Sequence, residues 1–377
     1  MLRSDGCHIR LLDMIKFLDD AGFRVIFYSN PSQAHWTWTP KYISEFQKQF
    51  PRINLIIEPT NFLSRAMRLI KNIVASYLPF LTRSVVRIGI PFITPAWSHL
   101  KSAESSAIFI VNYADGITQL NGVDTERTCV DTHDLGFRSY ALNSGQRIWS
   151  HRVRRRLTKE LSLLDCVRLT LTISPVERIF LKQALADRTI LYVPPALTLS
   201  PRKKEFQDSS ESLIADLLFL GSGNHKNTYY INDFLSKFVN WDANLTIAIA
   251  GDVSRKLSPL YLSHSHIKVL GYVDDIDMLY SQVRAAVCPV EGTGVNIKIL
   301  EALAYGKPVF AAPAAIEALS PNSSECVFSL SQESVKHVLD NDDLYLVAGN
   351  AAKFFGTQPA VSNAWNDLRQ QLEYLSR

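Results

Sequence analysis

Hydrophobic residues recur along the first half of the chain in two alternating patterns. The stretch HIRLLDMIKFLDDAGF (8–23) places apolar residues at helical spacing, which predicts an amphipathic helix that ends near Gly22. The apolar run RVIFYSN (24–30) follows and predicts a short buried strand. Similar runs lie at 54–59, 106–113, 127–134, 169–174 and 189–195, and helical patterns separate several of them. Strands that alternate with helices predict a parallel sheet covered on both faces.

A second series of strand-like runs follows a change in composition. Residues 197–215 are polar, charged and rich in serine, which is typical of a linker between domains. Short apolar runs then alternate with helical patterns from 216 to 330, and the tail predicts a helix with the apolar stripe Trp365, Leu368, Leu372 and Leu375. We therefore expect an N-terminal domain over 1–196, a linker over 197–212, a C-terminal domain over 213–340, and helices over 341–377 that pack back toward the N-terminal domain.

The beginning of the chain departs from the pattern of a doubly wound domain. Such a domain opens with a strand, a glycine loop and then a helix, whereas this chain opens on the loop-like stretch SDGCHIR. One interpretation is that the first strand is missing, through truncation or a misassigned start. The other is that Met1 is the true start and that another element takes the place of the strand.

Composition and charge narrow the class of protein. Hydrophobic residues make up 47% of the 377 residues and charged residues 20%, which is typical of a globular protein. The net charge of +4 and the lack of a recognised nucleic-acid module give no reason to expect nucleic acid as a partner. Five cysteines without a closely spaced pair indicate reduced thiols in the cytoplasm. We find neither a signal peptide nor a spanning segment, and expect a cytoplasmic protein.

The stretch EGTGVNIKILEALAYGKPVF (291–310) carries the clearest chemistry. A strand-like run is followed by a glycine loop and a short helix, and the start of such a helix presents backbone N–H groups to an anion. Lys298 adds a cation, and Glu301 lies one turn later on the same face, where a carboxylate can accept hydrogen bonds from a ribose diol. Together these features suggest a nucleoside diphosphate. The alternative is an ordinary loop followed by a surface ion pair.

With its flanking residues, this stretch resembles the donor-site signature of GT-B glycosyltransferases of family 4. Other stretches resemble the same family in the expected order: LLFLGSGNHKNTYYINDFL, IAIAGD and VLGYVDDIDMLYSQVRAAVCPV in the second half, and CVDTHDLGFRS and LTISPVERIFL in the first. The resemblance is dense over 216–319 and weak between about 60 and 105. It implies an α/β protein of two Rossmann-like domains that face a cleft, with a nucleotide-diphosphate sugar held mainly by the C-terminal one.

The resemblance also implies roles for individual residues. In the family the diphosphate is contacted by lysines, here Lys226 and Lys298, and the ribose by Glu301. Backbone groups of glycine loops complete the donor site, and histidine and aspartate line the cleft near the sugar. The implied donor-binding residues are Gly6, Gly221, Gly223, Lys226, Thr293, Gly294, Val295, Lys298 and Glu301, and the implied catalytic residues are His133 and Asp134.

Thr293 is the main departure from the family pattern. Many members place a second glutamate eight positions before the one that corresponds to Glu301, where it holds the donor sugar, and that position is Thr293. Many relatives with a GTG version of the loop lack it too. The resemblance implies a retaining enzyme in which fixed cations and helix-start amides stabilise the leaving diphosphate. We expect no metal and no cofactor, because the acidic residues in VDDIDMLY (273–280) are better explained as helix caps.

Three functions stay open at this point. The first is transfer of a sugar to a hydroxyl acceptor, which we expect to be a cell-surface glycan or a lipid-linked saccharide. The second is a nucleotide-sugar epimerase of the same fold. The third is a catalytically silent partner protein in polysaccharide assembly, which the threonine at position 293 and the unusual start of the chain suggest.

The segment 61–101 is a candidate for peripheral membrane contact. No Asp or Glu occurs between Pro59 and Ala103, and basic residues are spread among apolar ones, at Arg65, Arg68, Lys71, Arg83, Arg87 and Lys101. A surface of this kind suits an anionic membrane or an anionic lipid-linked acceptor, which would place the protein at the inner face of the cell membrane. The alternative is a packed helix pair with its arginines outward. The run RIWSHRVRRRLTK (147–159) either extends the basic patch or forms one solvated helix face.

Overall fold

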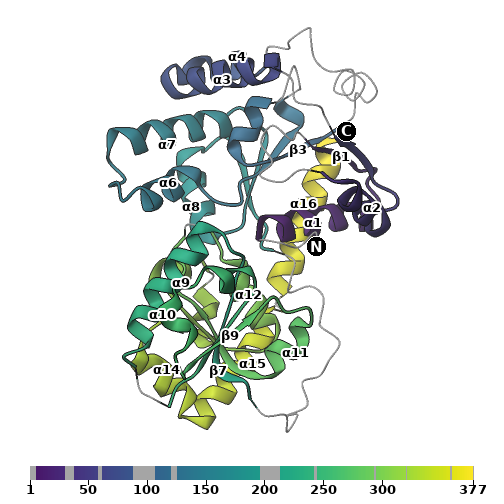
Figure 1. Cartoon of the computed structure of the whole chain (residues 1–377). Coiled ribbons are helices and arrows are strands. Elements are labelled where there is room, and N and C mark those ends of the chain that lie inside the picture. Colours follow the sequence, from purple (N-terminus) through teal and green to yellow (C-terminus); the bar gives the residue numbers. More distant parts are fainter. Residues whose placement is uncertain are drawn as a thin grey trace. The chain divides into compact units, whose positions relative to one another are not determined.

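The computed structural model shows a chain that folds into two compact units (Figure 1). Unit 1 comprises Met1–Pro194 and Asn363–Arg377, and unit 2 comprises Pro195–Ser362. The residues described are 6–29, 38–57, 62–87, 107–119, 125–195, 213–241, 244–292, 294–319, 321–356 and 359–376. The expected linker 197–212 lies outside these ranges. In the part of the chain that the structure describes, no helix is long and apolar enough to cross a membrane.

Unit 2 is built around a six-stranded parallel sheet. Its strands are β7 (Ala215–Leu220), β8 (Ile247–Ala250), β9 (Ile267–Gly271), β10 (Val283–Cys288), β11 (Val309–Ala311) and β12 (Val327–Ser329). They lie in the order β12-β11-β10-β7-β8-β9, and β7, β8 and β10 are almost entirely buried. The chain first moves from β7 toward β8 and β9, and then returns to place β10 on the other side of β7. A doubly wound sheet binds its ligands at the carboxyl ends of the strands where the order reverses, here between β7 and β10.

Helices connect these strands and cover the sheet (Figure 1). They are α9 (His225–Phe238), η5 (Asp252–Lys256), α10 (Pro259–Leu262), α11 (Ile276–Ser281), α12 (Ile297–Ala304), α13 (Pro313–Glu317), η6 (Pro321–Glu325), α14 (Gln332–Leu339) and α15 (Asp342–Gly356). The α9 helix buries a stripe of apolar side chains at helical spacing, including Ile231, Leu235 and Phe238. The α15 helix packs against α12 and therefore belongs to unit 2.

Unit 1 contains two parallel sheets. The first pairs β1 (Ile26–Ser29) with β2 (Asn54–Ile57), and the second has the order β3-β4-β5-β6, with β3 (Phe109–Asn112), β4 (Thr128–Asp131), β5 (Leu169–Thr172) and β6 (Thr189–Tyr192). Among the described residues, no strand precedes β1. No described strand pairs with both β1 and β3 to unite the two sheets. Residues 1–5 lie outside the described ranges, so the two interpretations of the chain start both stay open.

The remaining helices of unit 1 follow the pattern expected from the sequence. They are α1 (Gly6–Asp20), α2 (Pro40–Gln49), α3 (Phe62–Tyr77), η1 (Pro79–Leu81), α4 (Thr82–Arg87), η2 (Ala114–Gln119), η3 (Thr125–Arg127), α6 (Gly136–Asn143), α7 (His151–Leu164) and α8 (Pro175–Ala184). The predicted stripe of α1 buries Leu12, Ile15 and Leu18, and Gly22 follows with φ +83°. The predicted helix over 8–23 is therefore confirmed.

The last helix, α16 (Pro359–Leu375), begins in unit 2 and returns to unit 1 at residue 363. Its predicted stripe is confirmed, because Trp365, Leu368, Leu372 and Leu375 are all buried. The Trp365 ring stacks at a tilt against Phe17 of α1, 4.7 Å between centroids, and its Nε1–H donates to the carbonyl of Pro194 at 3.1 Å. These contacts fasten the C-terminal helix to α1 and to the segment after β6.

Candidate functional site

The loop after β7 reaches the switch point of the unit 2 sheet on two glycines, Gly221 and Gly223. A Cβ atom at Gly221 would lie 2.9 Å from the Phe219 ring, and one at Gly223 would lie 3.2 Å from the carbonyl of Asp252. Gly251, after the neighbouring strand β8, has φ +91°, and a Cβ atom there would lie 2.3 Å from the carbonyl oxygen of Gly221. Glycine is therefore needed where these two loops touch.

The α9 helix starts directly after this loop and presents Lys226 in its first turn. Asn224 caps the helix, because its side chain accepts a hydrogen bond from the backbone N–H of Asn227 at 2.8 Å. The Lys226 ammonium lies against Gly292, where a Cβ atom would be 2.9 Å from Nζ. Gly292 belongs to the loop after β10, so the loops that follow β7 and β10 meet at this lysine.

Lys298 projects from the first turn of α12 toward the same place. Its Nζ donates to the Asn227 side-chain oxygen at 2.9 Å and lies 4.3 Å from the centre of the Phe219 ring. Burial lowers the pKa of Lys298 to about 8; Cys288 and Glu301 act in the opposite direction, and Lys226 lowers it further. An anion that replaced water here would stabilise the charged form of Lys298.

Asn227 holds Lys298 in a fixed position. Its side-chain Nδ2 donates to the carbonyl and to the hydroxyl of Ser222, at 3.0 and 3.2 Å, which turns Oδ1 toward the lysine. The residue is only 7% exposed. Sequence reasoning missed Asn227, because nothing in the spacing of an asparagine beside Lys226 shows that it will meet a residue 71 positions later.

The start of α12 is open toward this cluster. The cap residue Asn296 makes no side-chain capping bond, and its Nδ2 instead donates to the carbonyl of Val290 at 3.3 Å. Gly294 and the buried Val295 precede it. Glu301, one turn after Lys298, is half-buried, and its negative charge supports the charged state of Lys298. Thr293 lies outside the described residues, so its position relative to this helix is not described.

A second polar cluster lies in unit 1, at the carboxyl ends of β3 and β4. His133 and Tyr113 both adopt left-handed backbone conformations, with φ +55° and +63°, and their rings stack at 4.6 Å. His133 Nε2 shares a hydrogen bond of 2.8 Å with the Asn112 side-chain oxygen. Left-handed residues other than glycine are strained and gather at functional sites. The predicted His133 is therefore joined by Tyr113 and Asn112, which the sequence did not single out.

Asp131 and Arg10 form a fully buried ion pair below this cluster. Arg10 Nε donates to Asp131 Oδ2 at 2.9 Å, and its Nη1 donates to the carbonyl of Pro194 at 3.1 Å. Burial alone would raise the pKa of Asp131, but Arg10 and His133 together lower it below its ordinary value. The pair fixes α1 to the end of β4, where His133 follows two residues later.

Gly6 and Asp134 occupy the edge of this second cluster. Gly6 is the first residue of α1, and the next residue, Cys7, places its sulfur 2.7 Å from the Tyr113 hydroxyl. Asp134 accepts a hydrogen bond from the Ser139 hydroxyl at 3.0 Å. The structure thus brings the predicted residues Gly6 and His133 to one region of unit 1, through Cys7 and Tyr113.

The α6 helix begins at Gly136, two residues after Asp134, and two buried glutamates close its N-terminus. Glu177 accepts a hydrogen bond from the backbone N–H of Leu135 at 3.1 Å, and Glu160 accepts from Gly136 and Phe137 at 2.9 and 3.0 Å. Burial raises the pKa of Glu160 to about 7 and that of Glu177 to about 8. Three backbone donors at this helix start are therefore already occupied by the protein's own side chains.

Within the described ranges, no three His, Cys, Asp or Glu side chains gather as they would around a metal ion. The acidic residues of 273–280 act locally, because Asp275 caps α11 and Asp277 bonds to the Tyr305 hydroxyl. The expectation that no metal is needed stays a prediction.

Comparison with known proteins adds a family to this geometry. Residues 215–340 match the family model of glycosyl transferases group 1, and these residues include the loops after β7 and β10 and the helix α12. A comparison with curated protein sequences found no match.

Solved structures resemble the whole chain. Sucrose-phosphate synthase from Thermosynechococcus elongatus is 14% identical, with a TM-score of 0.64, over 98% of this chain and 93% of that one. WaaG, a glycosyltransferase involved in lipopolysaccharide biosynthesis, is 13% identical with a TM-score of 0.59, over 98% and 96%. Anabaena Alr3699/HepE, solved with UDP and glucose, is 12% identical with a TM-score of 0.58, over 99% and 97%.

At these sequence identities the structural likeness establishes the fold alone. The family model covers the segment that contains Lys226, Lys298 and Glu301. The parallel sheets of both units agree with the two Rossmann-like domains expected from the sequence. The chain thus has the GT-B fold, and its residues 215–340 match the family model of glycosyl transferases group 1.

Proposed function

We propose that the protein transfers a sugar from a nucleotide-diphosphate sugar to a hydroxyl acceptor, with retention of the sugar's configuration and without a metal ion. One observation carries the proposal: Lys298 and Lys226, from two different helices, meet at the switch point of the unit 2 sheet beside the open start of α12. Two cations and a row of backbone N–H groups are the donors that a diphosphate needs. Glu301 lies one turn further along α12, where its carboxylate accepts hydrogen bonds from the ribose.

The same groups account for catalysis of bond cleavage. When the bond between the sugar and the diphosphate breaks, negative charge develops on the phosphate oxygens. Lys298 is held in place by Asn227 and Phe219 before the substrate binds, so it needs little reorganisation to stabilise that charge. In a retaining transfer the acceptor hydroxyl attacks the face that the diphosphate leaves, and the departing phosphate takes its proton. A strong protein base is then unnecessary.

The polar cluster of unit 1 is our proposal for the sugar and acceptor side. His133 is held by Asn112 and by the ring of Tyr113, in a strained backbone that presents it at the end of β4. We assign His133 and Asp134 the role of polarising sugar or acceptor hydroxyls. The neighbours solved with UDP and glucose make UDP-glucose the first donor to test.

The acceptor that we propose is a cell-surface glycan or a lipid-linked saccharide. The protein would then work in the cytoplasm at the inner face of the cell membrane, with the described part of 61–101 in peripheral contact with the lipid. The acid-free composition of that segment supports this assignment.

Calorimetric titration of UDP into the protein in the presence of EDTA tests the donor site. We expect binding in the wild type, and a loss of about 100-fold or more in affinity for Lys298→Ala, because a hydrogen-bonded charge pair with a phosphate is worth roughly 3 kcal/mol. Glu301→Ala should weaken the binding of UDP more than that of inorganic diphosphate, which has no ribose. Lys237→Ala is the matched control, since Lys237 is exposed at the far end of α9. Unchanged UDP affinity in both site variants would refute the assignment.

Product analysis separates transfer from the alternatives. NMR of the reaction with UDP-glucose and saccharide acceptors should show a product with the anomeric configuration of the donor. Conversion of the donor without an acceptor would favour an epimerase. Tight donor binding with no turnover over a broad acceptor set would favour a catalytically silent partner in polysaccharide assembly.

A further inference from the structure

One face of unit 1 exposes large apolar side chains on α3 and η1. Such residues are normally scattered singly on a soluble surface, but here they are contiguous along one helix and the turn after it. Phe80 is 77% exposed and Leu69 62%. The full set on these two elements and the residue between them is Leu69, Ile70, Ile73, Tyr77, Leu78, Phe80 and Leu81. An apolar patch of this kind marks an interaction surface.

The connection from α6 to α7 adds a second apolar group. Trp149 is 69% exposed, and Ile148 before it and Leu142 near the end of α6 are also exposed. The α3 and α7 helices pack against each other, and Arg155 of α7 links them directly, because it donates to the Tyr77 hydroxyl and lies 4.7 Å from the centre of the Tyr77 ring. We call the combined surface of α3, η1, and residues 142–156 the basic–apolar face.

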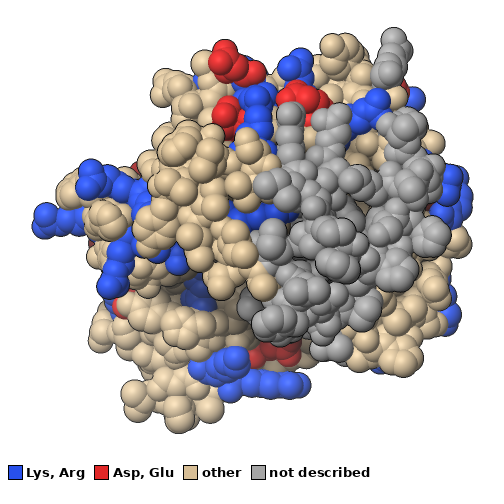
Figure 2. All heavy atoms as spheres, turned by 90° about the horizontal axis from the view of Figure 1, so that it is seen from above, with Lys and Arg blue, Asp and Glu red and all other residues tan. Residues whose placement is uncertain are grey.

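Arginines supply the charge of this face. Arg147, Arg152, Arg154, Arg155 and Arg156 are all exposed. No Asp or Glu occurs in 62–87 or in 135–159, and the one acid of α7, Glu160, is buried and accepts from the backbone of α6. Figure 2 looks onto the top of unit 1: the left half, where α3 and α7 lie in Figure 1, is mostly tan, and blue side chains project from its left edge.

Lys71 does not belong to this face, although the sequence grouped it with the basic residues of 61–101. Its side chain is buried, with its Nζ 3.4 Å from the carbonyl of Val86, and burial lowers its pKa to about 8. Lys71 therefore fastens α4 to α3. The side chains of Arg65, Arg68 and Arg87 and the residue Lys101 lie outside the described part.

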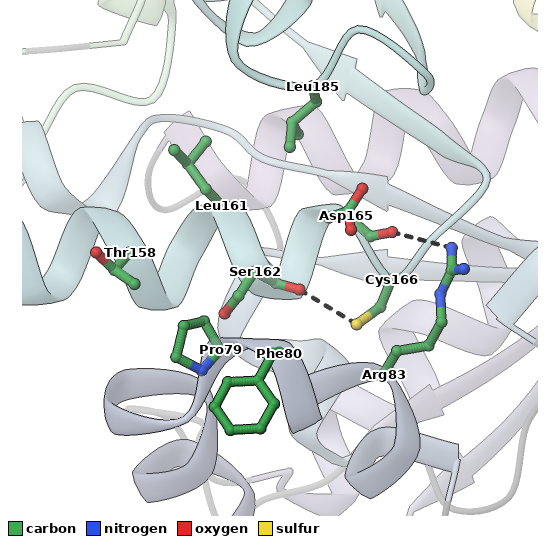
Figure 3. A pocket seen from close by; sticks show the side chains of 9 residues that line it. All are labelled: Pro79, Phe80, Arg83, Thr158, Leu161, Ser162, Asp165, Cys166 and Leu185. Atoms are coloured by element: carbon green, nitrogen blue, oxygen red, sulfur yellow. Dashed lines mark hydrogen bonds between the residues drawn. The ribbon is translucent and has the colours of Figure 1, made fainter.

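A groove of about 510 Å³ continues the face inward between η1 and α7 (Figure 3). Phe80 and Pro79 form one wall, and Leu161 and Leu185 line the other side. The one acidic residue in the groove, Asp165, is paired with Arg188 at 3.1 Å. The groove therefore extends the apolar surface without adding an unpaired negative charge.

We propose that the basic–apolar face docks on an anionic lipid bilayer, with the arginines among the head groups and Trp149, Ile148 and Phe80 at the acyl boundary. Exposed aromatic and aliphatic side chains bordered by arginines are the two components of interfacial membrane binding. A second copy of the chain does not fit, because a symmetric contact would place arginines against arginines. A nucleic acid would leave the exposed apolar side chains of α3 without an apolar partner. Membrane docking at this face deepens the proposed function, and its relevance to sugar transfer rests on that function.

Vesicle cosedimentation with the full chain tests the proposal. The probes are vesicles of pure phosphatidylcholine and vesicles with about 30 mol% phosphatidylglycerol, each at about 0.1 M and 0.5 M salt. At low salt we expect binding to the anionic vesicles and none to the phosphatidylcholine vesicles. At high salt we expect weaker binding to the anionic vesicles, which the apolar side chains maintain. Each arginine near an anionic surface raises the binding affinity about fivefold. The double variant Arg152→Gln/Arg154→Gln should therefore bind anionic vesicles about 30-fold more weakly. Trp149→Ser should remove the salt-resistant part.

The control removes two cations elsewhere in unit 1. Lys41→Gln/Lys48→Gln changes the charge of α2 by the same amount, on a helix that packs on α1, and should bind like the wild type. Circular dichroism checks that every variant is folded. UDP titration should be unchanged in all of them, which separates failure of this proposal from failure of the donor site. No binding to anionic vesicles, equal loss in the control, or arginine-dependent dimerisation without vesicle binding would overturn the inference.

Discussion

The lowered pKa of Lys298 predicts that donor binding depends on pH in a defined direction. In the empty site its Nζ bonds to a neutral amide and faces an aromatic ring, and burial lowers its pKa to about 8. A bound diphosphate raises that pKa, so the complex holds more protons than the empty protein above pH 8. Binding must therefore weaken as the pH rises through this range.

The magnitude follows from the fraction of charged lysine. With a pKa of about 8, Lys298 is about nine-tenths charged at pH 7 and about one-tenth charged at pH 9. The dissociation constant of UDP should therefore rise about tenfold between these values, which is about 1.4 kcal/mol. The terminal phosphate of UDP is already ionised at pH 7, so the ligand contributes little to the change.

Calorimetry in two buffers of different ionisation enthalpy measures both the affinity and the protons taken up. We expect uptake of about half a proton per UDP at pH 8 in the wild type. Lys298→Arg is the informative control, because an arginine stays charged throughout and should abolish both the uptake and the slope. A change of less than about twofold in the wild type from pH 7 to 9, or the same slope in the arginine variant, would refute this explanation.

Three further predictions concern residues that position the two clusters. Asn227→Ala should raise the dissociation constant of UDP by about 10- to 100-fold, because a hydrogen bond to a charged group is worth about 1.5–3 kcal/mol. In Asn227→Asp the added carboxylate raises the pKa of Lys298, so the weakening of UDP binding should begin at a higher pH. Gly251→Ala places a Cβ atom 2.3 Å from the Gly221 carbonyl oxygen at φ +91° and should lower the free energy of unfolding in urea by at least about 2 kcal/mol. Arg10→Met leaves Asp131 buried without its cation and should cost about 3–5 kcal/mol by the same assay. Adding Asp131→Asn should recover part of that loss, and no recovery would contradict the pairing.

The sequence predicted what local spacing determines. The pair Lys298 and Glu301 lies on one helix directly after a glycine loop, so the chain itself fixes their order and separation. The alternation of apolar runs with helical patterns predicted parallel sheets for the same reason. The burial of α1 and α16 also followed from periodicity, since one stripe of each helix is apolar.

Contacts between distant segments could not be predicted from a single sequence. Asn227 meets Lys298 across 71 residues, and Arg10 meets Asp131 across 121. Each depends on how two strands or helices pack, which spacing along the chain does not encode. Glu160 and Glu177 are a related case, because a periodic pattern counts them as polar surface positions, whereas both are buried.

Those two glutamates have a consequence for where a phosphate can settle. At α6 their carboxylates already accept from three backbone N–H groups, while at α12 no side chain caps the helix. A free anion would have to displace these two carboxyl groups from the backbone N–H groups at the start of α6, whereas the side chain of Asn296 does not occupy the N–H groups at the start of α12. Anions should therefore partition to unit 2. The α6 end of unit 1 is a poor receptor for phosphate, which leaves the neighbouring His133 and Asn112 to an uncharged ligand such as a sugar hydroxyl.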